Sequence, residues 1–468
     1  MRPSTSLPLR RSLLALAVCG LIAGCAVGPN YQRPPAPLSA EYKEAQGWQA
    51  AAPADALDRG PWWTLFEDAQ LNALVAQVEV SNQNVAAAAA AYAQARALVS
   101  EQRASLFPVV NLNGGANESG GGGNTPRSSR YQANIGLSWE PDVWGRIGRG
   151  ITSASAAAQA SEADLASARL SAQGELALNY FALRQADAQA DLLNATIAGY
   201  RKNQEITQNR YTAGIVAKTD VLQSQTQLAN AQAEALGLGR QRANAEHAIA
   251  VLIGRAPSEF SLPPEAWNDA VPAVPIGVPS TLLERRPDIA SAERRVAQAN
   301  EQIGIARSAY FPSFGLNASG GFGASKLAEL FSASSSLWSL GLSAAHTLFN
   351  AGATRARVAG SEAAHEEAVA RYRQIVLTAF QDVEDQLAAT RILSQQLELR
   401  RQASQAADQV EVQVLNRYRA GQVGFLEVVT TQAIALNARR AVVQLQGDRK
   451  ITAVALIQAL GGGWQVGQ

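Results

Sequence analysis

The chain has 468 residues, a hydrophobic fraction of 47% and a charged fraction of only 17%. Its formal net charge is +1, so composition gives no electrostatic reason to expect binding to nucleic acid or to an anionic membrane. The length allows two or three ordinary domains, and the abundance of Ala, Gln, Gly and Ser favours long, closely packed helices over an aromatic core.

Residues 1–24 have the pattern of a bacterial lipoprotein signal peptide. Three arginines form its basic start, and the apolar stretch 13–22 is too short to span a membrane. Small residues before Cys25 are typical of a lipoprotein cleavage site, so we expect a lipid on Cys25 and an outer membrane destination. An ordinary signal peptide with a chance cysteine is the alternative. Without the signal, Cys25 is the only cysteine, which leaves no partner for a disulfide.

Residues 25–66 contain several prolines and predict an extended, lipid-anchored strap. Apolar residues at helical spacing from Asp68 to about Ser105 then predict one helix. Phe107 and Pro108 end it, because a residue that precedes proline disfavours the α region.

Four segments alternate between apolar and polar residues, which predicts β-strands with one apolar and one polar face. The segments are about 109–118, 131–140, 313–322 and 337–346. Each has the length of a tilted transmembrane strand, and tryptophans lie near strand ends as in an aromatic girdle. A soluble hairpin with one wet face is the alternative. We expect the polar face to line water, through Asn111, Asn113, Gln132, Asn134 and Ser138.

Two motifs occur twice. Arg-Tyr-Thr-Ala-Gly ends at Gly214, and Arg-Tyr-Arg-Ala-Gly ends 207 residues later at Gly421. Arg-Ala-Ser-Leu-Phe-Pro ends at Pro108, and Arg-Ser-Ala-Tyr-Phe-Pro ends 204 residues later at Pro312. The nearly equal offsets indicate an internal duplication.

A long helix follows each predicted hairpin, over residues 151–211 and 353–418, and a returning helix follows each motif, over 220–254 and 427–460. Gly214 and Gly421 stand at the turns, where a left-handed backbone suits glycine. The predicted plan is a first repeat over 67–254, a connector over 255–279, a second repeat over 280–460 and a tail over 461–468.

Four strands cannot close a barrel, and an open sheet edge in lipid leaves backbone groups unpaired. The chain must therefore oligomerise: eight strands would enclose only side chains, whereas the twelve strands of a trimer leave a lumen. The predicted fold is mainly α with transmembrane β, duplicated as helix–hairpin–helix, with a trimeric twelve-stranded barrel continued by a long α-helical barrel.

Several motifs resemble the TolC-type outer membrane factors, in their NodT-type lipoprotein branch. They are the segment 25–31, Trp62-Trp63 with Phe66 and Asp68, and the segment 278–294. The resemblance implies a homotrimeric passive duct that docks a periplasmic adaptor and an inner membrane pump of the resistance-nodulation-division type and exports drugs or small toxic compounds. One departure is His346, where the family usually has proline.

The resemblance also implies a gate where the returning helices close the duct at its periplasmic tip. Glu427 falls on the first constriction acid, Thr430 replaces the second, and Asp220 is the duplicate of Glu427. Tyr418 matches a tyrosine that would hydrogen-bond Asp220, while Val423 stands in place of a latching arginine.

Helix capping is the competing interpretation of these acids. Asp220 with Gln223 has the spacing of a capping box, and Glu427 in a first helical turn suits the helix dipole.

Other polar clusters predict structure rather than chemistry. Arg285, Arg286 and Asp288 follow a capping box of Thr281 and Glu284, with Pro287 suited to a first helical turn. The three histidines have no ligand spacing, so we expect no metal site. With no nucleophile, base and orienting residue together, we expect no enzyme and no cofactor beyond the lipid on Cys25.

Three alternatives remain for the function. The same duct could serve metal-ion efflux or type I protein secretion, because a passive duct need not bind what passes. A lipoprotein scaffold or adhesin without a pore is the alternative from another class.

Overall fold

The computed structural model describes residues 26–36, 42–44, 61–120, 127–274 and 286–462. The predicted signal peptide, Cys25, most of the strap, the capping box of Thr281 and Glu284, Arg285 and nearly all of the tail lie outside these residues.

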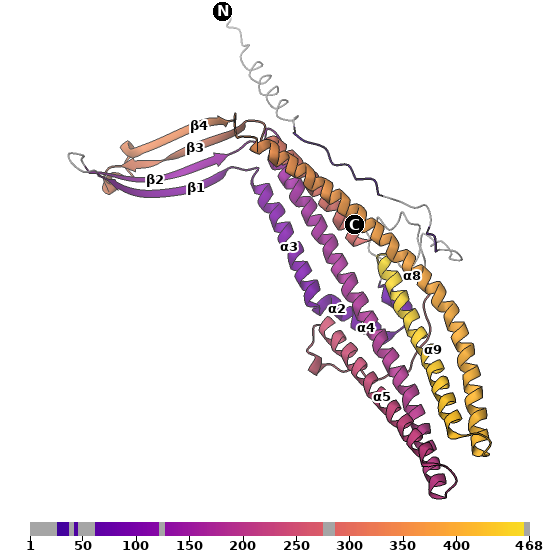
Figure 1. The fold of residues 1–468 in the computed structure, drawn as a ribbon. Coiled ribbons are helices and arrows are strands. Elements are labelled where there is room, and N and C mark those ends of the chain that lie inside the picture. Colours follow the sequence, from indigo (N-terminus) through magenta and orange to yellow (C-terminus); the bar gives the residue numbers. More distant parts are fainter. Residues whose placement is uncertain (1–25, 37–41, 45–60, 121–126, 275–285, 463–468) are drawn as a thin grey trace, which may run out of the picture. The chain divides into compact units, whose positions relative to one another are not determined.

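The order of elements is a helix, a hairpin and two helices, and this order occurs twice (Figure 1). The first copy consists of η2 (Trp62–Phe66), α2 (Ala69–Ser81), α3 (Gln83–Ala104), β1 (Val109–Ser119), β2 (Ser128–Trp139), α4 (Arg146–Thr212) and α5 (Lys218–Leu252). After η3 (Pro257–Glu259), the second consists of α7 (Pro287–Ser308), β3 (Ser313–Ala324), η4 (Leu327–Glu329), η5 (Ala333–Ser335), β4 (Ser336–Ala345), α8 (Ala353–Arg419) and α9 (Phe425–Ala459).

The chain divides into two compact units that do not follow the repeats. One unit comprises residues 1–35, 91–162 and 291–373, and the other comprises 36–90, 163–290 and 374–468. Each unit therefore takes residues from both copies of the duplication. The long helices α4 and α8 contribute to both units.

The single helix predicted from Asp68 to about Ser105 is wrong, because the chain breaks at Asn82 into α2 and α3. Asn82 has extended backbone, and its Oδ1 accepts hydrogen bonds from the amides of Asn84 and Val85 at 3.0 and 3.1 Å. Its Nδ2 donates to the carbonyl of Leu252 at 2.8 Å. An N-cap in the middle of an apolar pattern starts a new helix, and here it also ties that start to the end of α5.

One antiparallel sheet in the order β1-β2-β3-β4 belongs to the first unit. Asn113 pairs with Asn134, which pairs in turn with Gly321, and Ser319 pairs with Ser339. Because paired residues share a face, the register gathers the polar positions of all four strands on one side. These positions are Asn111, Asn113, Gln132, Asn134, Ser138, Asn317, Ser319, Ser339 and Ser343.

The other face of the sheet is apolar and uncovered in the single chain. Leu112, Leu342 and Trp338 keep 80%, 75% and 83% of their surface exposed. Exposed apolar side chains at this density mark a surface that faces lipid or a partner rather than water. The strands begin and end within three residues of the predicted bounds, and β2 differs most by starting at Ser128.

A short strap crosses the first unit before the helices begin. The amide of Val27 donates to the carbonyl of Trp144 at 3.0 Å. Arg149 donates to the carbonyl of Pro29 at 3.1 Å and forms an ion pair with Glu301 at 2.7 Å, with both side chains buried. Gly28 has a φ of +118° and lies so close to the backbone of α7 that a Cβ would clash. The sequence predicted an extended strap here. The buried ion pair of Arg149 and Glu301 lies beside the first residues of this strap and binds Pro29 through Arg149.

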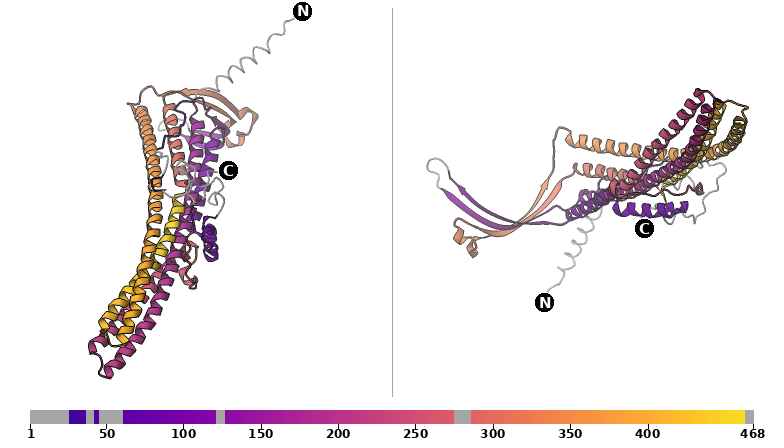
Figure 2. Two further views of the ribbon diagram at one scale, coloured as in Figure 1. Left: turned by 90° about the vertical axis from the view of Figure 1, so that its right-hand side faces the viewer. Right: turned by 90° about the horizontal axis from the view of Figure 1, so that it is seen from below.

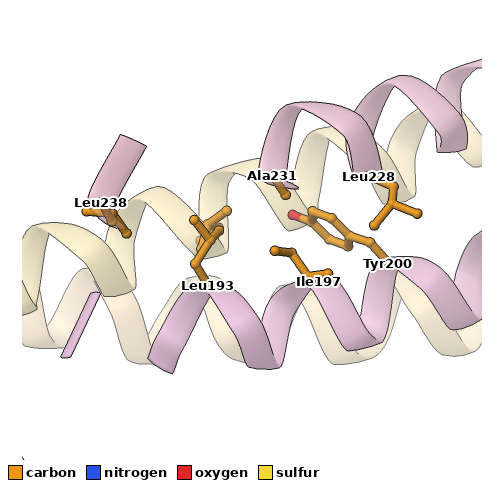
Figure 3. Close-up of a cluster of buried hydrophobic side chains, with 7 residues drawn as sticks. Leu193, Ile197, Tyr200, Leu228, Ala231 and Leu238 are labelled. Carbon is orange, nitrogen blue, oxygen red and sulfur yellow. The ribbon is translucent and has the colours of Figure 1, made fainter. Parts of the chain in front are cut away.

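In the second unit α4 lies beside α5 and α8 lies beside α9 (Figures 1 and 2). Figure 3 shows Leu193, Ile197 and Tyr200 of α4 facing α5, where Leu228 and Ala231 meet them. Leu436 of α9 completes this cluster, so it joins both helical hairpins. Burying each large apolar side chain contributes about 1.5–3 kcal/mol, enough to hold the helix pair together.

Candidate functional site: the paired helix turns

Both predicted turns close in the same way. Gly214 has a φ of +74° and donates to the carbonyl of Tyr211 at 2.9 Å, and Ile215 donates to the carbonyl of Arg210 at 2.9 Å. Gly421 repeats this with a φ of +76°. This is the Schellman closure, in which glycine takes the left-handed position after the last helical turn.

The turn between α8 and α9 has a core of its own. Tyr418 is only 6% exposed and packs with Val414, Phe425 and Val428. The rings of Tyr418 and Phe425 lie 5.5 Å apart between centroids. Tyr211, the duplicate of Tyr418, is exposed instead, so the two turns share a backbone but differ in packing.

Arg210 of the first turn contacts Tyr418 of the second. Its guanidinium lies 4.8 Å from the centroid of the Tyr418 ring, and its Nη1 donates to the Tyr418 carbonyl at 3.4 Å. A cation over a tyrosine ring is worth about 0.5–1 kcal/mol at an exposed site. Arg210 therefore joins the two hairpins at their ends. Arg210 opens the repeated motif, but no pattern along the chain indicates this contact with a residue 208 positions away.

The candidate gate acids lie in the first turns of the returning helices. Glu427 lies in the first turn of α9 and forms an exposed ion pair with Arg417 at 3.5 Å. Asp220 lies in the first turn of α5, half-buried, and no cation among the described residues comes within ion-pair distance. Thr430 is exposed and donates its hydroxyl to the carbonyl of Leu426 at 2.9 Å. The helix-dipole placement predicted for Glu427 is therefore present.

Two contacts predicted for Asp220 are absent. The N-cap of α5 is Ala217, whose side chain forms no cap, so Asp220 is not the first residue of a capping box. The hydroxyl of Tyr418 is buried with no hydrogen-bond partner among the described residues, so it does not bond Asp220 within the chain. Tyr418 turns toward Phe425 because the apolar cluster of its own hairpin buries the ring.

Further polar contacts join the hairpins away from the turns. Gln227 of α5 donates to Gln432 of α9 at 3.2 Å, and Arg440 of α9 forms an ion pair with Glu234 of α5. Sequence reasoning missed these contacts because the two residues of each pair lie about 205 positions apart. The spacing of residues along a single helix does not indicate which residues of another helix they contact.

The cluster around Arg286 has the structural role predicted for it. Burial disfavours its charged guanidinium, but Asp288 at 2.7 Å and Asp382 at 3.0 Å outweigh this and raise the pKa of Arg286. Pro287 begins α7, as the sequence predicted. Within the described ranges, no three His, Cys, Asp or Glu side chains gather as a metal site would require.

No helix in the described part of the chain is long and apolar enough to cross a membrane.

Long helical hairpins in duplicate, joined to amphipathic antiparallel strands, define the subunit of an outer membrane efflux channel. The chain belongs to the outer membrane efflux protein family, whose profile matches residues 74–255 and 278–462. This family consists of passive channels, so the expectations of a TolC-type channel and of a protein that is not an enzyme are confirmed.

Individual relatives agree over nearly the full length. The toluene efflux pump outer membrane protein TtgC of Pseudomonas putida is 32% identical, with 98% of each chain covered. SilC of Salmonella typhimurium, named a probable outer membrane lipoprotein, is 27% identical over 97% of this chain and 98% of its own. The solved outer-membrane channel OprN superposes with a TM-score of 0.87 at 32% identity, covering 94% of this chain and 100% of that one.

Proposed function

We propose that three copies of this chain form a passive duct that carries small toxic organic compounds out through the outer membrane. The observation that carries this is the sheet, which has a polar face, an uncovered apolar face and unpaired edges at β1 and β4. Joining β1 of one copy to β4 of the next would pair both edges. Three copies supply about twelve strands, wide enough for a water-filled lumen.

A lipid on Cys25 would fix each copy at the membrane. The residue after it, Ala26, lies against Gly145, and Val27 is hydrogen-bonded to Trp144. Both Trp144 and Gly145 follow shortly after Trp139, the last residue of β2. The strap therefore brings the chain that follows Cys25 to the base of the strands. At this position a lipid on Cys25 would add to the membrane anchoring that the strands themselves provide. SilC, which is named a lipoprotein, supports the same proposal.

The paired turns would meet a periplasmic adaptor, which links the duct to an inner membrane pump of the resistance-nodulation-division type. Ile215, at the end of the first turn, is 63% exposed although it is apolar, as expected of a docking surface. Organic cargo is favoured by TtgC, which is named for toluene efflux. Metal-ion efflux and protein secretion are the competing cargoes for the same duct.

In-cell crosslinking with mass spectrometry of the captured partners tests this assembly. Recovery of a proton-driven pump with its adaptor, together with toluene sensitivity in a strain that lacks this chain, would support the proposal. Recovery of an ATP-driven secretion transporter would instead move the cargo to protein. Failure to recover either, with no conductance from the purified protein in planar bilayers, would contradict the duct itself.

We also propose that Asp220, Glu427, Tyr418 and Thr430 belong to a gate at the turns. Replacing Asp220 and Glu427 together with Ala is expected to raise single-channel conductance, because two carboxylates at the turns no longer attract neighbouring donors. Single-channel recording in planar bilayers measures this. Glu366→Ala, on α8 away from the turns, is the control and should leave conductance unchanged. Equal conductance in the double variant and the control would reject the gate.

A further inference from the structure

A cavity of about 580 Å³ in the second unit has no role in the duct described above. Its wall comes from the end of η2, α4, α9 and the segment after η3. The residues that give it chemical character are Asp68, Tyr180, Phe181, Arg184, Trp267 and Lys450. Three aromatic side chains and two cations in one wall are typical of a binding site rather than of packing between helices.

Lys450 is the unusual member of this wall. It is only 4% exposed, and its Nζ lies 5.0 Å from the centroid of the Phe181 ring and 5.2 Å from that of Trp267. Among the described residues no carboxylate lies within ion-pair distance of Nζ and no acceptor hydrogen-bonds it. Burial lowers the pKa of Lys450, while the carboxylates of Asp68 and Asp269 oppose that shift from a distance. Because Lys450 lines the cavity and is partly desolvated, an anion bound there would compensate an ammonium that has no carboxylate partner among the described residues.

The charge of the other cation in the wall is already compensated. Arg184 donates to Asp187 at 3.2 Å, to Glu265 at 3.1 Å and to the carbonyl of Pro263 at 2.8 Å. Its charge is therefore compensated within the protein. Its Nε has no hydrogen-bond partner among the described residues, but its charge is compensated, so Lys450 is the cation whose charge a ligand of the cavity would neutralise.

The nearby acids are also occupied. Asp68 accepts from the hydroxyl of Tyr180 at 2.7 Å and caps α2. Asp269 accepts from Arg401 at 2.8 Å and from Gln446 at 3.0 Å. These two carboxylates lie near the cavity, and they would disfavour a second negative charge on a ligand.

We propose that this cavity binds a small organic monoanion, a carboxylate on a flat apolar body, that accepts hydrogen bonds from Lys450 and packs against Trp267. One free cation matches one negative charge. Inorganic phosphate, with a charge of about −1.5 to −2 at neutral pH, would meet repulsion from Asp68 and Asp269. The aromatic wall favours a flat apolar body over a fully hydrated ion.

Titration of the purified full-length protein with benzoate tests this, with calorimetry and tryptophan fluorescence as readouts. We expect saturable binding with a Kd of about 1 mM or tighter, and no binding of inorganic phosphate in the same range. Lys450→Met and Lys450→Gln are expected to weaken benzoate binding by about tenfold or more, because both remove the charge. The matched control is Lys202→Met, which removes an exposed lysine of α4 that does not line the cavity.

The pH profile distinguishes a direct contact from a structural role. Benzoate affinity should fall as pH rises through the lowered pKa of Lys450, since only the ammonium donates. The titratable groups near Lys450 are Asp68, Asp269, Glu67, Glu265, Arg184 and Tyr180. Burial raises the pKa of Tyr180 further above its ordinary value. A flat profile, equal affinity in wild type and Lys450→Gln, or no saturation with benzoate would each overturn the proposal. Trp267→Leu, which keeps the lysine, should weaken benzoate more than acetate.

Discussion

Arg210 shows how one residue can connect the two halves of a duplicated chain. Its contact with the ring and carbonyl of Tyr418 joins hairpins that lie 208 residues apart in sequence. Val423 stands where the resemblance to the family implies a latching arginine, so the proposed gate would need another link to close. Arg210 lies where such a link would act, because it contacts the turn of the other hairpin.

Arg210→Ala is expected to favour the open state of the gate. The lost cation–ring contact is worth about 0.5–1 kcal/mol in each chain. Three chains together would shift the ratio of open to closed channels by about tenfold or more. Recording the open probability in planar bilayers measures this shift.

Two further variants show whether the contact itself is responsible. Arg210→Lys, which retains a cation for the ring but loses the planar group, should show a smaller shift. Arg201→Ala removes an exposed arginine of the same helix and should change nothing. An open probability that is the same in Arg210→Ala and Arg201→Ala would exclude a latch at Arg210.

At the scale of elements, the turns depend on glycine for backbone conformation alone. Gly421 has a φ of +76° and empty space around its missing Cβ, so substitution meets strain but no clash. Gly421→Ala is therefore expected to lower the free energy of unfolding by about 1–2 kcal/mol. Gly360→Ala, in the interior of α8 and equally open, should raise it by about 0.5–1 kcal/mol because alanine favours a helix.

Thermal unfolding of both variants in the same detergent measures these effects. Tm is expected to fall for Gly421→Ala and to rise for Gly360→Ala. If both variants moved in the same direction, the left-handed turn would not be what requires glycine at Gly421.

The strap depends on a buried ion pair. Arg149 and Glu301 are each less than one tenth exposed, so removing one partner leaves the other charge buried. Glu301→Ala is expected to cost about 3–5 kcal/mol. Glu367→Ala breaks the exposed pair with Arg371 and should cost less than about 1 kcal/mol. Chemical denaturation measures both, and similar costs would mean that the strap is not held by this pair.

For the whole molecule, the two faces of the sheet predict opposite tolerance to charge. Leu340 lies on the uncovered apolar face, whereas its neighbour Ser339 lies on the polar face. Leu340→Arg is expected to cost about 2–4 kcal/mol if that face meets lipid, and so to reduce assembled channels in the outer membrane. Ser339→Arg should assemble normally and reduce conductance instead, since its charge would stand in the lumen.

Quantifying heat-modifiable oligomers in outer membrane fractions measures assembly. Equal assembly of the Leu340→Arg and Ser339→Arg variants would contradict a lipid-facing apolar surface. Because the two positions are adjacent in β4, a general effect of a bulky arginine on the strand would affect both alike.

The sequence by itself determined the class of protein and most of its elements. The recurrence of the Arg-Tyr motif, the alternation in four strands and the glycines at the turns are local patterns, and local backbone preference is enough to produce them. They predicted both long helices, both hairpins and the position of Glu427 in a first helical turn.

Only the tertiary structure decided which side chains meet across the chain. Asn82 is tied to the carbonyl of Leu252, Tyr418 packs against Phe425 rather than bonding Asp220, and Lys450 lies near two aromatic rings. Contacts between residues far apart in sequence are set by packing of whole helices, and the spacing of neighbours along one helix carries no record of them. The channel class therefore follows from local pattern, while the contact of Arg210 with Tyr418 and the cavity at Lys450 follow from packing.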